Sequence, residues 1–210
     1  MNPSLSPVSA LSAEAMARLR HVYENGFAEH LRAPFTEVVD SGRRDEEALA
    51  LVDGHGTPLG LAVLRHLGDT RWTYLRYLVV DESQRGRGIG AVLWKSMTSR
   101  LAAGGRTRLL WDVEDPEEDG LDEAEELVRR RRIRFYERQD GVLLQVEGYL
   151  TPHGPPGGRT QWDPMRLMTA RLVAGEEAHL RDLVVAVYRH RWGLPEDHPV
   201  VGSTLDRSGL

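Results

Sequence analysis

A glycine-rich turn at residues 85–90, RGRGIG, constrains this chain more than any other segment. It follows residues 72–80, which are dense in aromatic and β-branched side chains and therefore predict a strand. It precedes residues 91–101, whose apolar positions recur at helical spacing until the glycines at 104–105. Such a turn gathers free backbone N–H groups at a helix N-terminus, where pyrophosphate is a frequent ligand.

Two other phosphate-binding motifs match this turn only in part. The dinucleotide fingerprint G-x-G-x-x-G/A fits residues 86–91 loosely, and Asp112 lies about 20 residues on, where that motif has its ribose-binding acid. Residues 81–85 separate the strand from the turn, however, and a predicted antiparallel hairpin precedes the strand. Both features argue against the dinucleotide fingerprint. The P-loop requires Lys and Ser or Thr after the turn, whereas Ala91 and Val92 follow here. A tight connection without a ligand is a third interpretation.

The segment 77–90, YLVVDESQRGRGIG, resembles the acetyl-CoA motif of the GNAT superfamily of N-acetyltransferases. The core of that motif, [QR]-x-x-G-x-[GA], falls on Arg85, Gly88 and Gly90. A second family hallmark is a tyrosine in a short aromatic helix end before the next strand, and Tyr136 matches it. The resemblance covers about residues 45–150, and the two motifs stand in the family's order.

The order of the predicted elements and this resemblance lead to one fold class. Antiparallel strands come first and α-β alternation follows, so we expect an α/β (α+β) fold with a mixed, largely antiparallel sheet flanked by helices. We expect residues 1–174 to form the GNAT-like domain. Residues 175–210 are expected to form a C-terminal helix at 176–191 and an irregular tail, packed on the same domain. Residues 142–149 predict a strand, and the Pro/Gly-rich residues 151–163 predict a loop.

The resemblance implies that acetyl-CoA is the co-substrate, with its pantetheine arm along the strand 72–80 and its pyrophosphate on the turn. The residues expected to bind coenzyme A are Leu78, Val79, Val80, Arg85, Gly86, Arg87, Gly88, Ile89, Gly90 and Ala91.

The resemblance also implies that Tyr136 is the acid that protonates the departing thiolate, which suits a phenol with a pKa near about 10. A tyrosine of the core is the alternative. Asp112 and Glu114 alternate with apolar residues, so both carboxylates are predicted on one face of the strand 108–114. Either could be the general base, could bind the substrate's ammonium, or could be a solvated strand end.

Some family members carry the base on the preceding strand, where this chain has Tyr74 and Arg76. We therefore expect these two residues to bind substrate, together with Trp162 of the long loop; His153 could also line the acceptor pocket. Ten of the fifteen residues 112–126 are acidic, which would favour a cationic amine but would also stabilise a helix start.

Composition excludes several other classes. The chain has no cysteine, which removes an acyl-cysteine intermediate and favours direct attack in a ternary complex, and the scattered histidines predict no metal site. A net charge of −5 argues against nucleic acid as a partner. No apolar run approaches the roughly 20 residues that span a bilayer, and the first residues lack a signal-peptide pattern, so we expect a cytoplasmic protein without a membrane partner. The bias against Lys, Asn and Ile is typical of a bacterial GC-rich genome.

The predicted function is transfer of an acetyl or other short acyl group from coenzyme A to a primary amine of a small molecule. Acylation of a protein or peptide is the nearest alternative, and a coenzyme-A-binding regulatory module without turnover is an alternative of another class. The sequence allows a homodimer.

Overall fold

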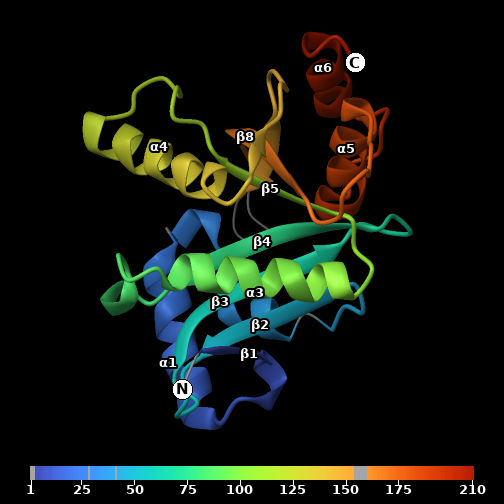
Figure 1. Ribbon diagram of the computed structural model, residues 1–210. Coiled ribbons are helices and arrows are strands. Elements are labelled where there is room, and N and C mark those ends of the chain that lie inside the picture. Colours follow the sequence, from blue (N-terminus) through green and yellow to red (C-terminus); the bar gives the residue numbers. More distant parts are fainter. Residues whose placement is uncertain (1–2, 28, 41, 154–159) are drawn as a thin grey trace. The chain divides into compact units, whose positions relative to one another are not determined.

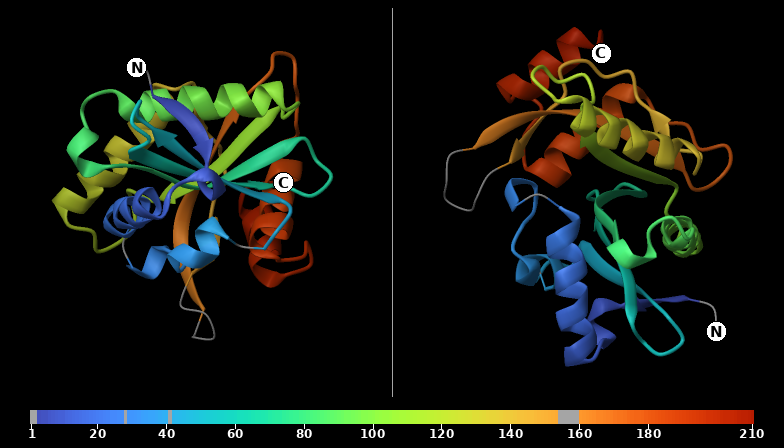
Figure 2. Two further views of the ribbon diagram at one scale, coloured as in Figure 1. Left: turned by 90° about the horizontal axis from the view of Figure 1, so that it is seen from below. Right: turned by 90° about the vertical axis from the view of Figure 1, so that its left-hand side faces the viewer.

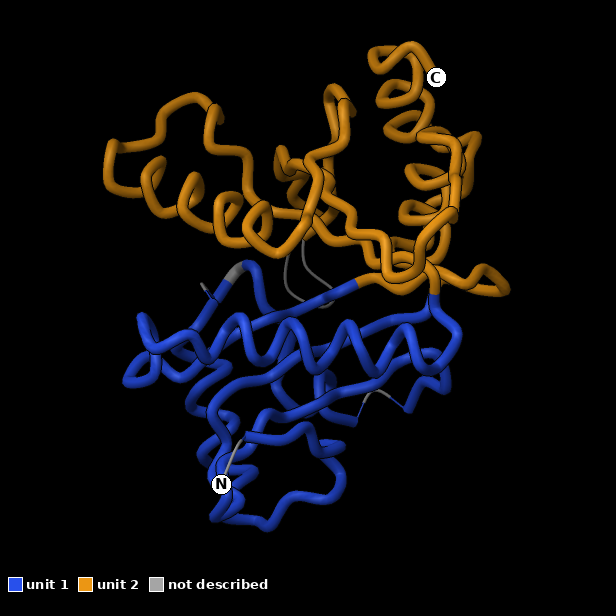
Figure 3. The backbone as a smooth tube through the Cα atoms, viewed as in Figure 1, with its two compact units in different colours: residues 1–66, 75–106 blue, residues 67–74, 107–210 orange. Residues whose placement is uncertain are grey.

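The computed structural model describes residues 3–27, 29–40, 42–153 and 160–210, and the chain divides into two compact units (Figure 3). Unit 1 comprises residues 1–66 and 75–106, and unit 2 comprises residues 67–74 and 107–210. The predicted boundary at 174 and 175 is a different division of the chain and stays a prediction.

Unit 1 is built on antiparallel pairs of strands with helices on both sides. Strand β2 pairs with β1 on one side and β3 on the other, and β4 neighbours β3. The strands are β1 (Ser4–Pro7), β2 (Glu46–Val52), β3 (Pro58–His66) and, in its second part, β4 (Trp72–Val80). The helices are η1 (Val8–Ala10), α1 (Ala13–Gly26), η2 (Glu29–Leu31), α2 (Phe35–Val39), η3 (Glu82–Gln84) and α3 (Ile89–Ala103).

Helices α1 and α3 cover opposite faces of these strands (Figure 2, right). Ser12 is the N-cap of α1, because its hydroxyl accepts a hydrogen bond from the Ala15 N–H at 3.2 Å. The apolar stripe of α1, at Leu19, Val22 and Tyr23, is buried in the core that α1 shares with β2, β3 and β4.

Unit 2 contains the remaining strands and the C-terminal helices (Figure 1). Its strands are β5 (Arg108–Glu114), β6 (Val142–Leu143), β7 (Leu150–His153) and β8 (Gln161–Arg171), and its helices are α4 (Glu123–Glu137), α5 (Leu180–Ala186), the π-helical turn η4 (Val187–Trp192) and α6 (Pro199–Arg207). Strand β5 pairs in parallel with the start of β4, and β8 pairs antiparallel with β5, β6 and β7. The predicted fold class, a mixed and largely antiparallel sheet flanked by helices, is confirmed.

The C-terminal helices are part of the core of unit 2. Leu183 and Val187 pack with Leu110 and Tyr149 in one apolar cluster. Glu176, just before α5, accepts hydrogen bonds from the Trp72 indole at 2.8 Å and from Arg108 Nε at 2.9 Å. The C-terminal segment is therefore fixed to β4 and β5 by polar contacts as well as by burial.

Three predictions of local structure were wrong. The strand expected at 142–149 ends at Leu143, and a new strand, β7, begins at Leu150 and extends into the predicted loop at 151–163. Residues 154–159 of that loop lie outside the described residues. The tail is not irregular, because His198 caps α6 through its Nδ1 and Pro199 stands at the first helical position.

Among the helices of the described residues, none is long and apolar enough to cross a membrane.

Candidate functional site

The glycine turn of unit 1 leaves β4 through a short, well-ordered connection. Asp81 caps η3 by accepting a hydrogen bond from the Ser83 N–H at 2.9 Å, and it also pairs with Arg18 of α1 at 2.9 Å. This places the turn directly before α3.

Two glycines of the turn adopt a conformation that other residues rarely take. Gly86 has φ +74° and Gly88 has φ +79°, both in the left-handed region, and Gly88 is the N-cap of α3. No side chain caps this helix and its first turn has no acidic residue. The first amides of α3, at Ile89, Gly90 and Ala91, therefore have no intrahelical partner. The helix end can bind an anion through backbone N–H groups.

The neighbouring residues predicted to hold coenzyme A differ in exposure. The side chains of Arg85 and Arg87 are exposed beside the turn and add positive charge. On β4, Val79 is buried in the core with α1, while Leu78 and Val80 are half-buried on the opposite face because side chains alternate along a strand.

Arg76, predicted to bind substrate, is an ion-pair partner in unit 1. Its Nη1 lies 2.9 Å from both oxygens of Glu46, and the Glu46 carboxylate also pairs with Arg65. The guanidinium of Arg76 lies 5.5 Å from the centre of the Tyr77 ring.

Asp112, a candidate base, is partly buried in unit 2. The hydroxyl of Tyr74, the predicted substrate-binding residue on β4, interacts with this carboxyl group and lowers its pKa. One carboxylate oxygen, Oδ2, is buried and has no hydrogen-bond partner within the described residues. Burial raises the pKa of Asp112, although the Tyr74 hydroxyl and the positive charge of Arg191 oppose this shift. A buried oxygen without a partner is costly and calls for an explanation.

Glu114, the second candidate base, has a different environment. It lies at the end of β5, and its carboxylate forms an ion pair with Arg132 of α4. The alternation along β5 puts both carboxylates on one face of the strand, as predicted, but they contact different partners.

Tyr136, the candidate acid, packs against the other face of β5. The centre of its ring lies 4.9 Å from the centre of the Trp111 ring. Trp111 precedes Asp112 on the strand, so its side chain points to the face opposite the one that carries Asp112. Burial raises the pKa of Tyr136 to about 12, so its hydroxyl keeps its proton at neutral pH.

Strand β7 brings together polar groups that the sequence reasoning left largely unassigned. His153 Nδ1 lies 3.0 Å from Asp163 Oδ2, and the centre of the His153 ring lies 5.3 Å from the centre of the Trp192 ring. Arg191 of η4 lies over the ring of Tyr74, with its guanidinium carbon 5.6 Å from the ring centre. A π-helical turn is uncommon and often marks a functional site, but no sequence signal indicates it here.

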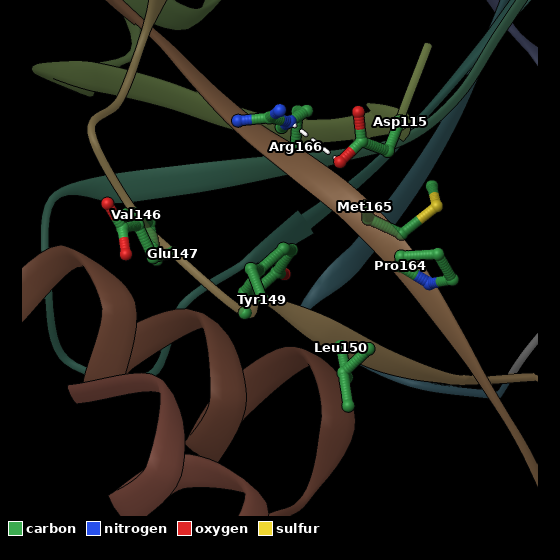
Figure 4. Close-up of a pocket in the computed structure, with 9 residues that line it drawn as sticks. Asp115, Val146, Glu147, Tyr149, Leu150, Pro164, Met165 and Arg166 are labelled. Atoms are coloured by element: carbon green, nitrogen blue, oxygen red, sulfur yellow. Dashed lines mark hydrogen bonds and ion pairs between the residues drawn. The ribbon is translucent and has the colours of Figure 1, made fainter. Parts of the chain in front are cut away.

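Trp162, the third predicted substrate-binding residue, contacts the ring of His198 at 5.9 Å. A pocket of about 300 Å³, which Trp162 does not line, lies between residues 146–150 and residues 164–166 of β8 (Figure 4). In its wall, Arg166 Nε donates to Asp115 Oδ2 at 2.9 Å, while Glu147 is exposed.

The comparisons with known proteins agree with this architecture. A family model described as Acetyltransferase (GNAT) family matches residues 14–141. No curated protein matches the chain. Among solved structures, a protein from Bacteroides thetaiotaomicron assigned to the GNAT family is similar over 90% of this chain and 98% of its own, with a TM-score of 0.66 and 16% identity.

Two further structures have named acceptors. An aminoglycoside 6'-N-acetyltransferase complexed with coenzyme A has a TM-score of 0.60 and 20% identity, over 82% of this chain and 99% of its own. The ribosomal-protein-S18-alanine N-acetyltransferase from Escherichia coli has a TM-score of 0.55 and 16% identity, over 85% of this chain and 100% of its own. At these identities the structures support the fold, and the family match covers more than half of the chain. This chain therefore belongs to the GNAT acetyltransferase family.

Proposed function

We propose that this acetyltransferase transfers an acetyl or other short acyl group from coenzyme A to a primary amine of a small molecule, by direct attack in a ternary complex. The observation that carries the proposal is the uncapped N-terminus of α3, which follows a turn with two left-handed glycines. A cytoplasmic location is part of the proposal.

The pyrophosphate of coenzyme A would accept hydrogen bonds from the first amides of α3. The N-terminal end of the helix dipole favours a negative charge there, and Arg85 and Arg87 lie exposed beside it. A side chain at Gly86 or Gly88 would strain the backbone and stand where the phosphates approach. The pantetheine arm would run along the half-buried Leu78 and Val80.

The chemistry would use groups of unit 2. The amine nitrogen attacks the thioester carbonyl, and the leaving thiolate takes a proton from Tyr136, whose raised pKa keeps that proton available. Asp112 lies on the other face of β5 from Tyr136, and its unpartnered Oδ2 is suited to accept a hydrogen bond from the amine.

A small cationic molecule is the acceptor that the charges favour. Acidic residues fill the end of β5 and the segment after it, and they attract ammonium groups. The aminoglycoside acceptor of one similar structure is of this chemical type, whereas another similar structure is a ribosomal-protein-S18-alanine N-acetyltransferase.

Binding of acetyl-CoA can be tested with two variants of one glycine. Gly88→Asn and Gly88→Asp have side chains of nearly the same shape, and both residue types tolerate a positive φ better than most. They differ in charge. We expect calorimetry to give a much larger loss of acetyl-CoA affinity for Gly88→Asp than for Gly88→Asn, with both variants folded. Equal affinities would contradict pyrophosphate binding at this turn.

The acceptor can be identified by measuring release of free thiol from acetyl-CoA in the presence of amines. We expect release with small polyamines or amino sugars and little with peptides that have a free N-terminus or lysine. Preference for a peptide would favour the protein-acetyltransferase alternative. Tight binding of acetyl-CoA without thiol release for any amine would favour a regulatory module.

A further inference from the structure

The side chains of His153 and Asp163 form a pair on the antiparallel ladder of β7 and β8. Thr151 is directly opposite Asp163 in that ladder, and His153 is the next residue along β7 on the same face. His153 Nδ1 lies 3.0 Å from Asp163 Oδ2 and 3.3 Å from the Thr151 hydroxyl oxygen. Only 15% of each side chain of the pair is exposed, so the ladder holds the imidazole ring in one orientation.

This contact influences where the ring carries its proton. Asp163 Oδ2 accepts no hydrogen bond within the described residues, but an ionised carboxylate 3.0 Å away favours a proton on the nitrogen that faces it, and a protonated Nδ1 can donate to the Thr151 hydroxyl. In the neutral ring the lone pair is then on Nε2. Both polar contacts of His153 are made by Nδ1, and within the described residues Nε2 has none. The pair therefore presents a lone pair that is free to accept a proton.

The surroundings keep this ring neutral and basic. Burial is the largest influence and lowers the pKa of His153; Arg191 of η4 acts in the same direction. Asp112 of β5 and Asp163 of β8 oppose the shift by favouring the charged ring. A histidine of this kind is mostly neutral at pH 7 and is stabilised by two carboxylates once it takes up a proton, which is the behaviour of a general base.

The two carboxylates first considered as bases are less suited to this step. The Oδ2 atom of Asp112 is buried and the carboxyl group interacts with the Tyr74 hydroxyl, while Glu114 is engaged by Arg132. His153 is partly exposed, and the charge of Asp112 influences it, so the two side chains belong to one electrostatic cluster.

We propose that His153, positioned by Asp163, accepts the proton that the acceptor amine loses on acylation. The inference rests on the proposed acetyl transfer. The amine nitrogen forms a bond with the thioester carbon and becomes positively charged, and Nε2 of His153 takes a proton from it. The C–S bond breaks, and the thiolate takes the proton of Tyr136. The proton on His153 returns to the Tyr136 phenolate through solvent, so the products are the amide and free coenzyme A. In this scheme Asp112 is a positioning and charge-stabilising residue.

The test compares the pH dependence of thiol release for the wild-type protein and His153→Gln, with the acceptor that the amine screen identifies. His179→Gln, at the exposed N-cap of α5, is the matched control. We expect His153→Gln to lose roughly 10²–10⁴-fold in kcat at neutral pH and to lose the acidic limb of the profile, with acetyl-CoA affinity unchanged. His179→Gln should keep both rate and profile.

Asp163→Asn adds a readout that a merely structural contact would not change. Removing this carboxylate should lower the pKa of His153, as measured by NMR titration of labelled histidine, and should move the acidic limb of the rate profile to lower pH by the same amount. An acidic limb that persists in His153→Gln would overturn this inference alone. Absence of thiol release from the wild-type protein with every amine would overturn the proposed function and this inference with it.

Discussion

Each unit of the molecule contains a carboxylate with a buried oxygen, and the two carboxylates have very different partners. Glu46 in unit 1 has a side chain that is 4% exposed, and Arg65 and Arg76 both donate to it, with Arg76 at 2.9 Å from each oxygen. Asp112 in unit 2 also has a buried oxygen, Oδ2, but this atom has no hydrogen-bond partner within the described residues, although the Tyr74 hydroxyl and Arg191 lower the pKa of the carboxyl group.

This difference in partners distinguishes Glu46, a structural carboxylate, from Asp112, a carboxylate that is suited to a binding or catalytic site. Two guanidiniums offset the cost of burying the Glu46 charge, so that this side chain joins β2, β3 and β4. The orphan oxygen of Asp112 costs about 1–3 kcal/mol in a folded protein. Proteins retain such a cost mainly where a ligand or a reaction uses the group.

Replacing Glu46 should have the largest effect on stability. Glu46→Gln removes the charge that two buried guanidiniums contact, and we expect the free energy of unfolding to fall by about 3–5 kcal/mol in urea titrations. The matched control is Glu47→Gln, because Glu47 pairs with the exposed Arg100 and should lose less than about 1 kcal/mol. A similar loss in both variants would mean that Glu46 is not the structural centre of its network.

Tyr136 should show the reverse pattern, with a large effect on rate. Tyr136→Phe removes the proposed acid, and we expect kcat to fall roughly 10²–10⁴-fold with acetyl-CoA affinity kept. Tyr23→Phe is the control in unit 1, since the Tyr23 hydroxyl donates a structural hydrogen bond to the Ala33 carbonyl at 3.0 Å. Near-normal turnover of Tyr136→Phe would make Tyr136 a core residue that packs on Trp111.

Asp112 should affect rate less than Tyr136 does, because in the proposed scheme it neither donates nor takes the transferred proton. Asp112→Asn keeps the shape and the hydrogen bond from Tyr74, and we expect a roughly 10-fold loss of kcat/KM for the acceptor, seen mainly in KM. Glu114→Gln, which alters an ion pair with Arg132, should be nearly neutral. If Glu114→Gln had the larger effect, the acceptor site would lie nearer to the end of β5.

The sequence predicted the elements whose causes are local. Ser12 caps α1 because a hydroxyl followed by helix-forming residues is a local signal, and strand 72–80 has the predicted bounds because six of its nine side chains are aromatic or β-branched. The glycine turn was predicted for the same reason. Helix α6 was missed although Pro199 at its first position is a start signal that could have been used.

The features that were not predicted depend on contacts between distant residues. Glu46 and Arg76 are 30 positions apart, and only the arrangement of three strands brings them together. Strand β7 contains Pro152 next to a Pro/Gly-rich segment, so local propensity predicted a loop, and pairing with β8 outweighs it. The pair of His153 and Asp163 follows from that ladder, which explains why the sequence showed the residues but not their relation.

The smallest expected effect, on the pH dependence of stability, distinguishes the two carboxylates most directly. Burial raises the pKa of Asp112, so the native protein holds this proton to higher pH than the unfolded chain does. The stability associated with the protonated form is fully present below the pKa of the unfolded chain, about 3.9, and is lost as the pH rises through the pKa of the folded protein. The loss is about 1.4 kcal/mol for each pH unit that separates the two pKa values.

Asp112→Asn cannot ionise, so it should remove this decline. We expect the variant to gain Tm relative to the wild-type protein between pH 4 and pH 7, as measured by calorimetry, and to be at least as stable at pH 7. Glu46→Gln should instead be less stable than the wild type, and most clearly at pH 7, where the native ion pairs are fully charged. The contrary result would be a difference in Tm between Asp112→Asn and the wild type that stays constant from pH 4 to pH 7. It would mean that Arg191 and Tyr74 compensate the charge of Asp112 as fully as two arginines compensate that of Glu46.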